Sequence, residues 1–320
     1  MPGIPPAPTQ SQFGQIAKAI DPNAQVLSTR KLVGGLGCRM DLLEFQLPNG
    51  EPQIVVTRQY WVLSDPEEKP RLRREGDILR TLAANGVPVP DVVLEQDVAS
   101  EIFGRPGIVI SYLNGKPDLI PEDPNDWATQ LAQSIARVHA ITVPESLKSL
   151  PTDHTNTARK WMTADEPPEK FLKHELGREL WNAMRELWPT VDTSAAQMIH
   201  TDFWPGNTLW NRGKLIALID WEWPALGEPM GDVAYFLADI SYSGFDVEDS
   251  FLEANEEASG KPVYDLLFWK MFATAIPMPD PGHWAQGYAE LGIRHMTADD
   301  IRRAHTEYIR SLLEEFHTNA

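Results

Sequence analysis

The sequence predicts an α+β fold of two lobes, in which a β-rich N-terminal lobe precedes a mainly helical C-terminal lobe. The chain has 320 residues, which is more than a single hydrophobic core usually supports. Short apolar runs separated by turn residues dominate residues 25–113, whereas helical periodicity dominates from about Asp126. We therefore expect a flexible leader and a short helix at 1–24, the β-rich lobe at 25–113 and the helical lobe at 114–320.

The elements of the β-rich lobe are predicted from turn and breaker residues. A short helix, Ser11–Ile20, is ended by Asp21-Pro22, and Pro48-Asn49-Gly50 is a strong hairpin signal. One longer helix is expected at Arg71–Asn85, because its apolar residues share a face and Asn85-Gly86 ends it. The expected strands are Gln25–Val33, Leu42–Leu47, Gln53–Tyr60, Val92–Leu94 and Gly107–Tyr112.

The C-terminal lobe is predicted to be helical apart from one loop-and-hairpin segment. That segment covers Gln197–Trp210 and Leu215–Ile219 and holds the acidic residues discussed below. The expected helices are Trp127–His139, Pro168–Leu187, Pro229–Ser241, Pro262–Ile276 and Ala298–His317.

The charge of the chain argues against nucleic acid as a partner. The formal net charge is −18, whereas binding to a phosphate backbone needs a basic surface. Residues 1–113 carry 11 basic and 13 acidic side chains, and residues 114–320 carry 17 and 33. This acidic excess has two interpretations: a solubilising surface, or a field that attracts cationic substrates to the C-terminal lobe.

The sequence contains no signal for a membrane, a disulfide or a zinc site. The most apolar window, Leu266–Ile276, is too short to span a bilayer and carries Lys270. Met1–Gln10 has neither the basic start nor the apolar stretch of a signal peptide. Cys38 is the only cysteine and is expected in a loop, so a reducing cytoplasm is the expected location. The eight histidines show no zinc-binding spacing.

The most informative segment is the run His200-Thr201-Asp202-Phe203-Trp204-Pro205-Gly206-Asn207, followed by Ile219-Asp220-Trp221-Glu222. A carboxylate on a loop can orient a hydroxyl group and accept its proton. An amide oxygen and a second carboxylate can ligate Mg²⁺, which commonly uses only one or two protein oxygens. The spacing therefore indicates phosphoryl transfer.

These residues resemble the motifs of the aminoglycoside phosphotransferase and choline kinase-like family, which has the two-lobed protein-kinase-like fold. The continuation Gly227-Glu228-Pro229-Met230-Gly231-Asp232 also resembles that family, and the similarity covers roughly Leu27 to Phe236. The resemblance implies that Asp202 is the catalytic base or hydroxyl-orienting carboxylate. It implies that Asn207 and Asp220 are Mg²⁺ ligands.

The same resemblance implies supporting roles for His200 and Asp232, which would brace the catalytic loop without touching the substrate. His139 matches a family position and is expected to form a hydrogen bond in the core. Glu222 has two interpretations, a ligand of a second metal ion or a loop carboxylate with its hydrogen bonds satisfied, and we favour the second.

In the N-terminal lobe, Arg58 is expected to bind the nucleotide phosphates and Glu75 to pair with it. Many kinase-like enzymes have Lys at this strand position, but Arg also binds phosphate and does so through a planar, bidentate group. The alternative is a surface Arg and a Glu favoured by its helix N-terminus. The Gly-rich run containing Gly34 and Gly35 is expected to bring backbone amides close to the phosphates.

Ile108-Val109-Ile110-Ser111-Tyr112-Leu113 resembles the hinge between the lobes, where adenine would pair with the backbone at Ser111 and Leu113. The leading hypothesis is a kinase that uses Mg²⁺ and ATP or GTP to phosphorylate a hydroxyl group of a small molecule. A cationic acceptor, such as an aminoglycoside or an amino alcohol, fits the acidic C-terminal lobe. The alternatives are a nucleotide-binding regulatory protein with little turnover and a metal-dependent hydrolase. The oligomeric state is not predicted.

Overall fold

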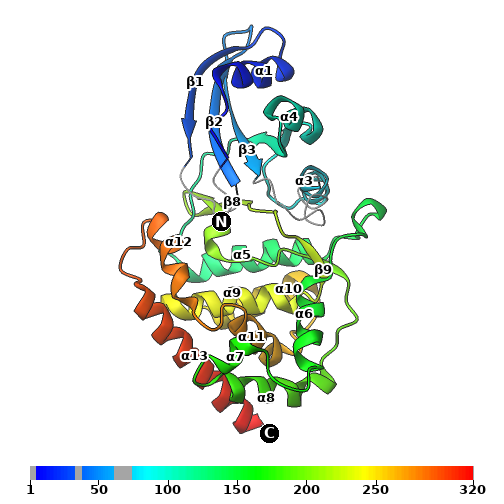
Figure 1. Cartoon of the computed structure of the whole chain (residues 1–320), viewed down its shortest axis with the longest axis vertical. Coiled ribbons are helices and arrows are strands. Elements are labelled where there is room, and N and C mark those ends of the chain that lie inside the picture. The colour runs from blue at the N-terminus through cyan, green and yellow to red at the C-terminus, as the bar shows by residue number, and fades with distance from the viewer. Residues whose placement is uncertain (1–4, 33–37, 61–73, 320) are drawn as a thin grey trace. The chain divides into compact units, whose positions relative to one another are not determined.

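The computed structural model describes residues 5–32, 38–60 and 74–319. The chain divides into two compact units (Figure 1). The first is Met1–Gly115 together with Ile219–Glu222, and the second is Lys116–Leu218 together with Trp223–Ala320. The first unit contains a five-stranded sheet and the second is mainly helical, so the predicted α+β class is confirmed.

The sheet of the first unit is antiparallel, with the strand order β1-β2-β3-β5-β4. The predicted hairpin between the second and third strands is present: Gly50 N–H donates to Leu47 C=O at 2.9 Å, and Gly50 has a φ of 85°. All five predicted strands exist. Their bounds are β1 Gln25–Lys31, β2 Cys38–Gln46, β3 Pro52–Tyr60, β4 Val92–Leu94 and β5 Gly107–Ser111.

One face of this sheet is covered by α1 (Gln10–Ile20) and α4 (Gln96–Phe103) (Figure 1). Thr9 caps α1 through a capping box with Gln12, so this helix begins where the sequence offers a hydroxyl group. Helix α4 was not predicted. The core between these elements comprises Phe13, Ile16, Ala17, Ala24, Leu43, Phe45, Val55, Ala99, Phe103 and Val109.

The opposite face of the sheet carries Arg58. Successive side chains of a strand point to opposite faces, so Arg58 shares its face with its register partners Met40 on β2 and Ile108 on β5. Helix α3 (Glu75–Ala84) begins with Glu75 and lies beside Ile108. This confirms the described part of the predicted helix Arg71–Asn85, whose first three residues lie outside the described ranges.

The second unit consists mostly of helices. None of the described helices is both long and apolar enough to cross a membrane. The α-helices are α5 Pro124–His139, α6 Asp153–Met162, α7 Glu169–Leu172, α8 Gly177–Leu187, α9 Met230–Ser243, α10 Glu248–Ser259, α11 Leu266–Ala275, α12 Ala285–Glu290 and α13 Ala298–Asn319. The short 3-10 helices are η1 Glu145–Leu147, η2 Trp188–Thr190, η3 Pro205–Asn207 and η4 Pro281–Trp284.

Two antiparallel strand pairs frame the loop that holds Asp202. Strand β6 (Gln197–Ile199) pairs with β9 (Ala225–Gly227), and β7 (Thr208–Asn211) pairs with β8 (Lys214–Leu218). The predicted loop-and-hairpin segment is thereby confirmed.

The predicted helix Pro168–Leu187 is wrong, because the chain forms two helices there, α7 and α8. Gly177 explains the break: a Cβ at this position would lie 2.0 Å from the carbonyl oxygen of Phe171, so the two helices meet where no larger residue fits. Helices α6, α10 and α12 were not predicted.

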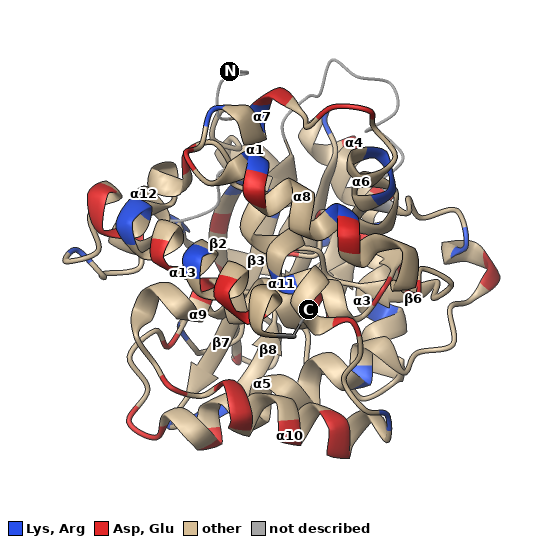
Figure 2. Ribbon diagram, turned by 90° about the horizontal axis from the view of Figure 1, so that it is seen from below, with Lys and Arg blue, Asp and Glu red and all other residues tan. Residues whose placement is uncertain are grey.

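Helix α10 accounts for part of the acidic excess of the second unit. It carries Glu248, Asp249, Glu253, Glu256 and Glu257 and no basic residue, and Figure 2 shows these acidic positions along it. Its buried face is formed by Phe251, Ala254 and Asn255. The acidic residues of this helix therefore form the solvated face of an amphipathic helix.

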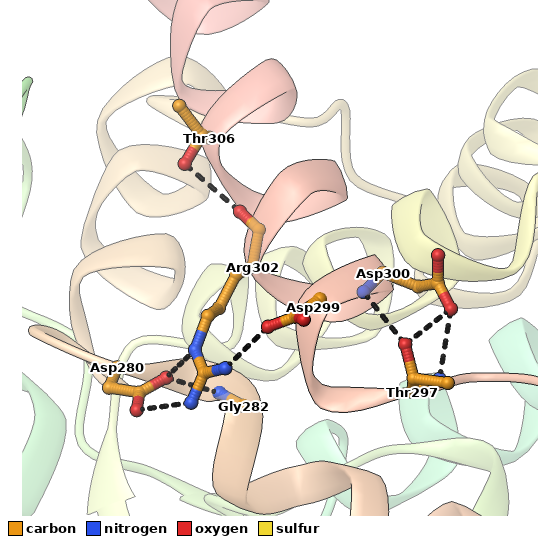
Figure 3. Close-up of polar contacts among 7 residues, drawn as sticks. All are labelled: Asp280, Gly282, Thr297, Asp299, Asp300, Arg302 and Thr306. Atoms are coloured by element: carbon orange, nitrogen blue, oxygen red, sulfur yellow. Dashed lines mark hydrogen bonds and ion pairs between the residues drawn. The ribbon is translucent and has the colours of Figure 1, made fainter.

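The start of α13 is fixed to η4 by an exposed cluster of ion pairs (Figure 3). Arg302 donates from Nε and Nη2 to the carboxylate of Asp280 at 2.9 and 2.8 Å, and Asp280 also caps η4 by accepting from Gly282 N–H. Thr297 and Asp300 exchange hydrogen bonds as a capping box at the start of α13. Since these pairs are exposed to water, they contribute little to stability.

Candidate active site

In the first unit, Arg58 lies at the centre of a cluster of acidic side chains. Its Nη1 donates to Glu75 Oε1 at 2.6 Å, while its Nη2 donates to Asp220 Oδ1 at 2.8 Å and to Glu222 Oε1 at 2.6 Å. Nη2 also lies 3.5 Å from Cys38 Sγ. The surface interpretation of Arg58 and Glu75 is therefore wrong, because both are buried and paired.

Burial dominates the electrostatics of this cluster. It raises the pKa of Glu75 to about 7, against the opposing effect of the Arg58 guanidinium. It raises the pKa of the Cys38 thiol to about 12. Cys38 is not in a loop as expected but is the first residue of β2 and is buried, so it is an inert thiol next to Arg58.

Asp220 has an unusual backbone conformation. Its φ is 67°, in the left-handed region that non-glycine residues rarely adopt. It lies two residues after the end of β8, and 37% of its side chain is exposed. Strained conformations of this kind concentrate at functional sites.

Of the predicted hinge residues, Ser111 is the last residue of β5 and Leu113 follows the strand. Ser111 N–H donates to Asp91 C=O at 2.8 Å, and Ser111 Oγ accepts from Asp91 N–H at 2.9 Å. Within the described ranges, Leu113 N–H makes no hydrogen bond, whereas its carbonyl accepts from Gly115 N–H. Adenine pairing at Ser111 would therefore use the carbonyl oxygen. Gly34 and Gly35 lie outside the described residues.

In the second unit, the loop after β6 places Asp202 and Asn207 in direct contact. Asn207 Nδ2 donates to the main-chain carbonyl of Asp202 at 2.9 Å and to its Oδ2 at 2.8 Å. The turn between them is the 3-10 helix η3, which begins with Pro205. Gly206 lets the Trp204 ring lie close to the backbone, since a Cβ would be 2.2 Å from that ring. The segment from Asp202 to Asn207 thus forms a local turn, in which Asn207 fixes the carboxylate of Asp202.

Asp232, on α9, holds the start of this loop. It is completely buried; its Oδ2 accepts from His200 N–H at 2.7 Å, and its Oδ1 accepts from Thr201 N–H at 2.8 Å. His139 Nε2 lies 3.0 Å from the same Oδ2. Thr201 has a φ of 69°, which is rare for a β-branched residue, so these hydrogen bonds fix a strained backbone. This is the bracing role expected of Asp232, and His139 lies in the core as expected.

Sequence reasoning missed Tyr235 and Asp239, which follow Asp232 on α9. The Tyr235 hydroxyl group donates a hydrogen bond to the Asp202 carboxylate. Asp239 is 8% exposed and accepts from Tyr288 Oη at 2.6 Å. Residues at i, i+3 and i+7 lie along one helix face, so the spacing of polar residues in the predicted helix was the signal that could have revealed them.

Asp239 lines a cavity of about 20 Å³ together with Pro205, Tyr288 and Met296. This volume holds one small group. Burial raises the pKa of Asp239 to about 7, and the negative charge of Asp202 adds to this shift, while the Tyr288 hydrogen bond opposes it. Among the described residues, no Lys or Arg forms an ion pair with Asp239.

The four Trp residues near the motif divide between core and surface. Trp210 and Trp221 are buried, whereas 40% of Trp223 is exposed. Trp204 packs edge-to-face against Tyr288, with 5.5 Å between the ring centroids. Trp204 thus packs against a residue, Tyr288, that lines the cavity beside Asp239.

The donor groups present fit a magnesium ion and a nucleotide. Because Asn207 uses its amide nitrogen on Asp202, its amide oxygen remains as a ligand, and Asp220 is partly exposed. Each is an oxygen ligand of the kind that Mg²⁺ prefers, Asn207 in the second unit and Asp220 in the first. Among the described residues, Arg58 Nε is a buried N–H donor without a hydrogen-bond partner. Among the described residues, no group of three or more His, Cys, Asp or Glu is placed to hold a metal.

Comparison with known proteins supports the same interpretation. A family model described as "Phosphotransferase enzyme family" matches residues 53–272. "Acyl-CoA dehydrogenase family member 10" of Mus musculus is 26% identical over 271 residues, which are 77% of this chain and 24% of that protein. Homoserine kinase of Burkholderia cenocepacia is 37% identical over 65 residues, 20% of this chain and 19% of the enzyme. This chain therefore matches only about a quarter or less of the length of these relatives.

Several solved structures have the same fold. Macrolide 2'-phosphotransferase MphH from Brachybacterium faecium has a TM-score of 0.58 at 19% identity, covering 91% of this chain and 98% of that one. Choline kinase LicA from Streptococcus pneumoniae has a TM-score of 0.57 at 15% identity, covering 95% and 100%. ADP-bound aminoglycoside phosphotransferase APH(2'')-Ib has a TM-score of 0.55 at 14% identity, covering 96% and 99%. These likenesses show the protein-kinase-like fold.

Proposed function

Because the chain belongs to the phosphotransferase enzyme family, we propose that it transfers the γ-phosphate of ATP or GTP to a hydroxyl group of a small molecule. The observation that carries the proposal is the fixed carboxylate of Asp202. Asn207 holds it from within the same loop and Tyr235 holds it from α9. In phosphoryl transfer the protein mainly positions the reacting groups and does little covalent chemistry. This loop supplies a carboxylate in a fixed position.

Each functional residue has a role in this proposal. Asp202 orients the acceptor hydroxyl group and accepts its proton. Asn207 and Asp220 hold Mg²⁺, which when bound neutralises negative charge on the phosphates. Arg58 donates hydrogen bonds to the phosphates from a position that Glu75 fixes.

The first unit is proposed to bind the nucleotide. The fold is shared with an aminoglycoside phosphotransferase that was solved with ADP bound, which supports an adenine nucleotide. Ser111 and Leu113 present a carbonyl group and an N–H group to the adenine, and Gly34 and Gly35 remain proposed contacts of the phosphates.

The second unit is proposed to bind the acceptor, and a cationic acceptor has the best support. Asp239 is a buried carboxylate with a hydroxyl partner and no Lys or Arg partner among the described residues. Burying a carboxylate in this way is costly unless a cation compensates it. Choline and homoserine, the substrates named in two of the similar proteins, each carry an ammonium group. An amino alcohol with a small primary ammonium group therefore fits the cavity beside Asp239 better than a neutral acceptor.

A screen for nucleotide consumption tests this proposal. The purified chain is incubated with Mg²⁺, ATP or GTP, and a panel of hydroxylated compounds, and release of the nucleoside diphosphate is measured. The panel contains amino alcohols, aminoglycosides, macrolides and neutral sugars. It also contains a hydroxylated acyl-CoA thioester, because the mouse relative is named an acyl-CoA dehydrogenase family member.

The expected result is acceptor-dependent turnover that the Asp202→Ala variant loses while its nucleotide affinity changes little. Asp249→Ala, on the exposed face of α10, is the control and should behave as the wild type. Full activity in Asp202→Ala would contradict the role of this residue. Nucleotide binding without turnover on any acceptor would favour the regulatory alternative.

A further inference from the structure

Glu222 contacts Arg58, the residue that was expected to pair with Glu75. Arg58 divides its guanidinium between two sides: Nη1 faces Glu75, and Nη2 faces Glu222 and Asp220. Glu75 lies 17 residues after Arg58 in the chain and Glu222 lies 164 residues after it. Both belong to the first unit. Each of the two terminal nitrogens of the Arg58 guanidinium thus has a carboxylate partner.

The three carboxylates differ in how firmly their surroundings hold them. The exposed fractions of the side chains are 3% for Glu75, 8% for Glu222 and 37% for Asp220. When a buried carboxylate moves away from a buried guanidinium, the guanidinium is left as an unpaired charge in a medium of low dielectric constant, which is energetically costly. An exposed one can turn to water or to another cation. Glu75 and Glu222 are therefore the fixed partners of Arg58, and Asp220 is the exchangeable one.

The surroundings of Glu222 do not favour a metal site. Its Oε1 accepts from Arg58 Nη2 at 2.6 Å, and its side chain is buried. A buried carboxylate already paired with a guanidinium is poorly placed to take a second metal ion.

The geometry also explains why this strand position carries Arg. A guanidinium presents separate nitrogens in a rigid fork, so Glu75 and Glu222 can each bind a different nitrogen. A Lys ammonium is a single point on a flexible stem and cannot keep both contacts in a fixed plane.

We propose that Glu222 is a positioning residue that, together with Glu75, clamps the Arg58 guanidinium in the orientation that binds the nucleotide phosphates. This inference rests on the proposed function, since it assigns Glu222 to the nucleotide side of that reaction. When Asp220 turns toward a metal ion, Nη2 of Arg58 keeps Glu222 as its partner, so the guanidinium does not reorient.

Four proteins test the inference: the wild type, Glu222→Gln, Arg58→Lys and the double variant. The dissociation constant for ADP is measured by calorimetry in EDTA and again with Mg²⁺, and the melting temperature is recorded without nucleotide. Glu44→Gln is the matched control, because Glu44 lies on β2 of the same sheet and accepts from Ser28 rather than from Arg58.

We expect Glu222→Gln to weaken ADP binding about tenfold, the scale of one charge-assisted hydrogen bond, equally in EDTA and with Mg²⁺. The KM for the acceptor should not change. The double variant should bind ADP about as weakly as Arg58→Lys alone, because both changes remove the same clamp.

Three results would overturn the inference. The first is an ADP affinity of Glu222→Gln within twofold of the wild type, while Asp202→Ala loses turnover as expected. The proposed function would then stand, but Glu222 would not position Arg58. The second is a loss of affinity that appears only with Mg²⁺, which would make Glu222 a metal ligand. The third is a wild-type protein that binds no nucleotide, which would overturn the proposed function and the inference together.

Discussion

The side-chain amide of Asn207 donates two hydrogen bonds to Asp202, one to its main-chain carbonyl and one to its carboxylate. A single residue therefore fixes both the backbone and the side chain of the proposed base. Because the nitrogen of this amide is used on Asp202, its oxygen remains for the metal ion of the proposed function. This double use explains why an amide, rather than a second carboxylate, occupies the position.

The first prediction concerns Asn207→Asp. The change keeps a potential metal ligand but replaces the amide donor by a negative charge next to Asp202. We expect kcat to fall by roughly a hundredfold, since a charge-assisted hydrogen bond contributes about 1.5–3 kcal/mol and like charges now repel. Steady-state kinetics check it, with the exposed Asn182→Ala on α8 as control. An Asn207→Asp variant with wild-type kcat would show that the amide donor is dispensable.

The second prediction concerns Tyr235→Phe, which removes the hydroxyl group that binds Asp202. We expect kcat to fall about tenfold while nucleotide affinity stays constant, because one hydrogen bond to a charged group is lost. Tyr264→Phe is a matched control: Tyr264 donates to the carboxylate of Glu228 at 2.9 Å, away from the catalytic loop. If both variants lose activity equally, the effect of Tyr235 is structural rather than specific to Asp202.

Local signals explain what could be predicted from the sequence. The hairpin at Pro48-Asn49-Gly50, the strand that carries Arg58 and the loop from His200 to Asn207 each depend on residues close together in the chain. The contact between Asn207 and Asp202 spans five residues, so a motif can encode it. The expected pairing of Arg58 with Glu75 likewise came from the predicted strand end and the predicted start of the next helix.

Long-range partners explain what could not be predicted. Glu222 meets Arg58 across 164 residues, and Tyr288 meets Asp239 across 49. No local spacing identifies such pairs, because they depend on which elements pack together. The division of Pro168–Leu187 into two helices has a similar cause, since the close approach of Phe171 to Gly177 is a tertiary constraint that helical periodicity does not reveal.

The third prediction is a pH dependence that Asp239 contributes. Its pKa is raised from 3.8 to about 7 in the folded chain. Between these values the folded state binds more protons than the unfolded state, so the free energy of unfolding falls as the pH rises from about 4 to about 7. Asp239→Asn removes this contribution. The variant should therefore gain stability relative to the wild type at pH 8 but not at pH 4, as measured by melting temperature.

The exposed Asp249→Asn on α10 is the control for this measurement and should leave the pH profile unchanged. Parallel profiles of wild type and Asp239→Asn would contradict the assignment. The acceptor adds a second readout: with an ammonium-bearing acceptor, KM should rise below about pH 7 in the wild type, because protonation removes the charge of Asp239. In Asp239→Asn, KM should be high and independent of this ionisation.

The fourth prediction concerns Asp232→Asn. One of the two carboxylate oxygens becomes an NH₂ group, which must then face either Thr201 N–H or the pair His200 N–H and His139. Either orientation leaves a buried donor unsatisfied, and the strained backbone of Thr201 loses its restraint. We expect a loss of about 3–5 kcal/mol in the free energy of unfolding, the cost of breaking a buried charged network. Denaturant unfolding measures it.

A matched variant separates the cost to the fold from the cost to catalysis. Glu228→Gln changes another buried carboxylate of the same unit, which accepts from Ala195 N–H and Tyr264 Oη and does not touch the catalytic loop. Both variants should be less stable than the wild type, but only Asp232→Asn should also lower kcat at temperatures where each remains folded. If kcat falls equally in both, or in neither, Asp232 does not act through Thr201 and His200 on the position of Asp202.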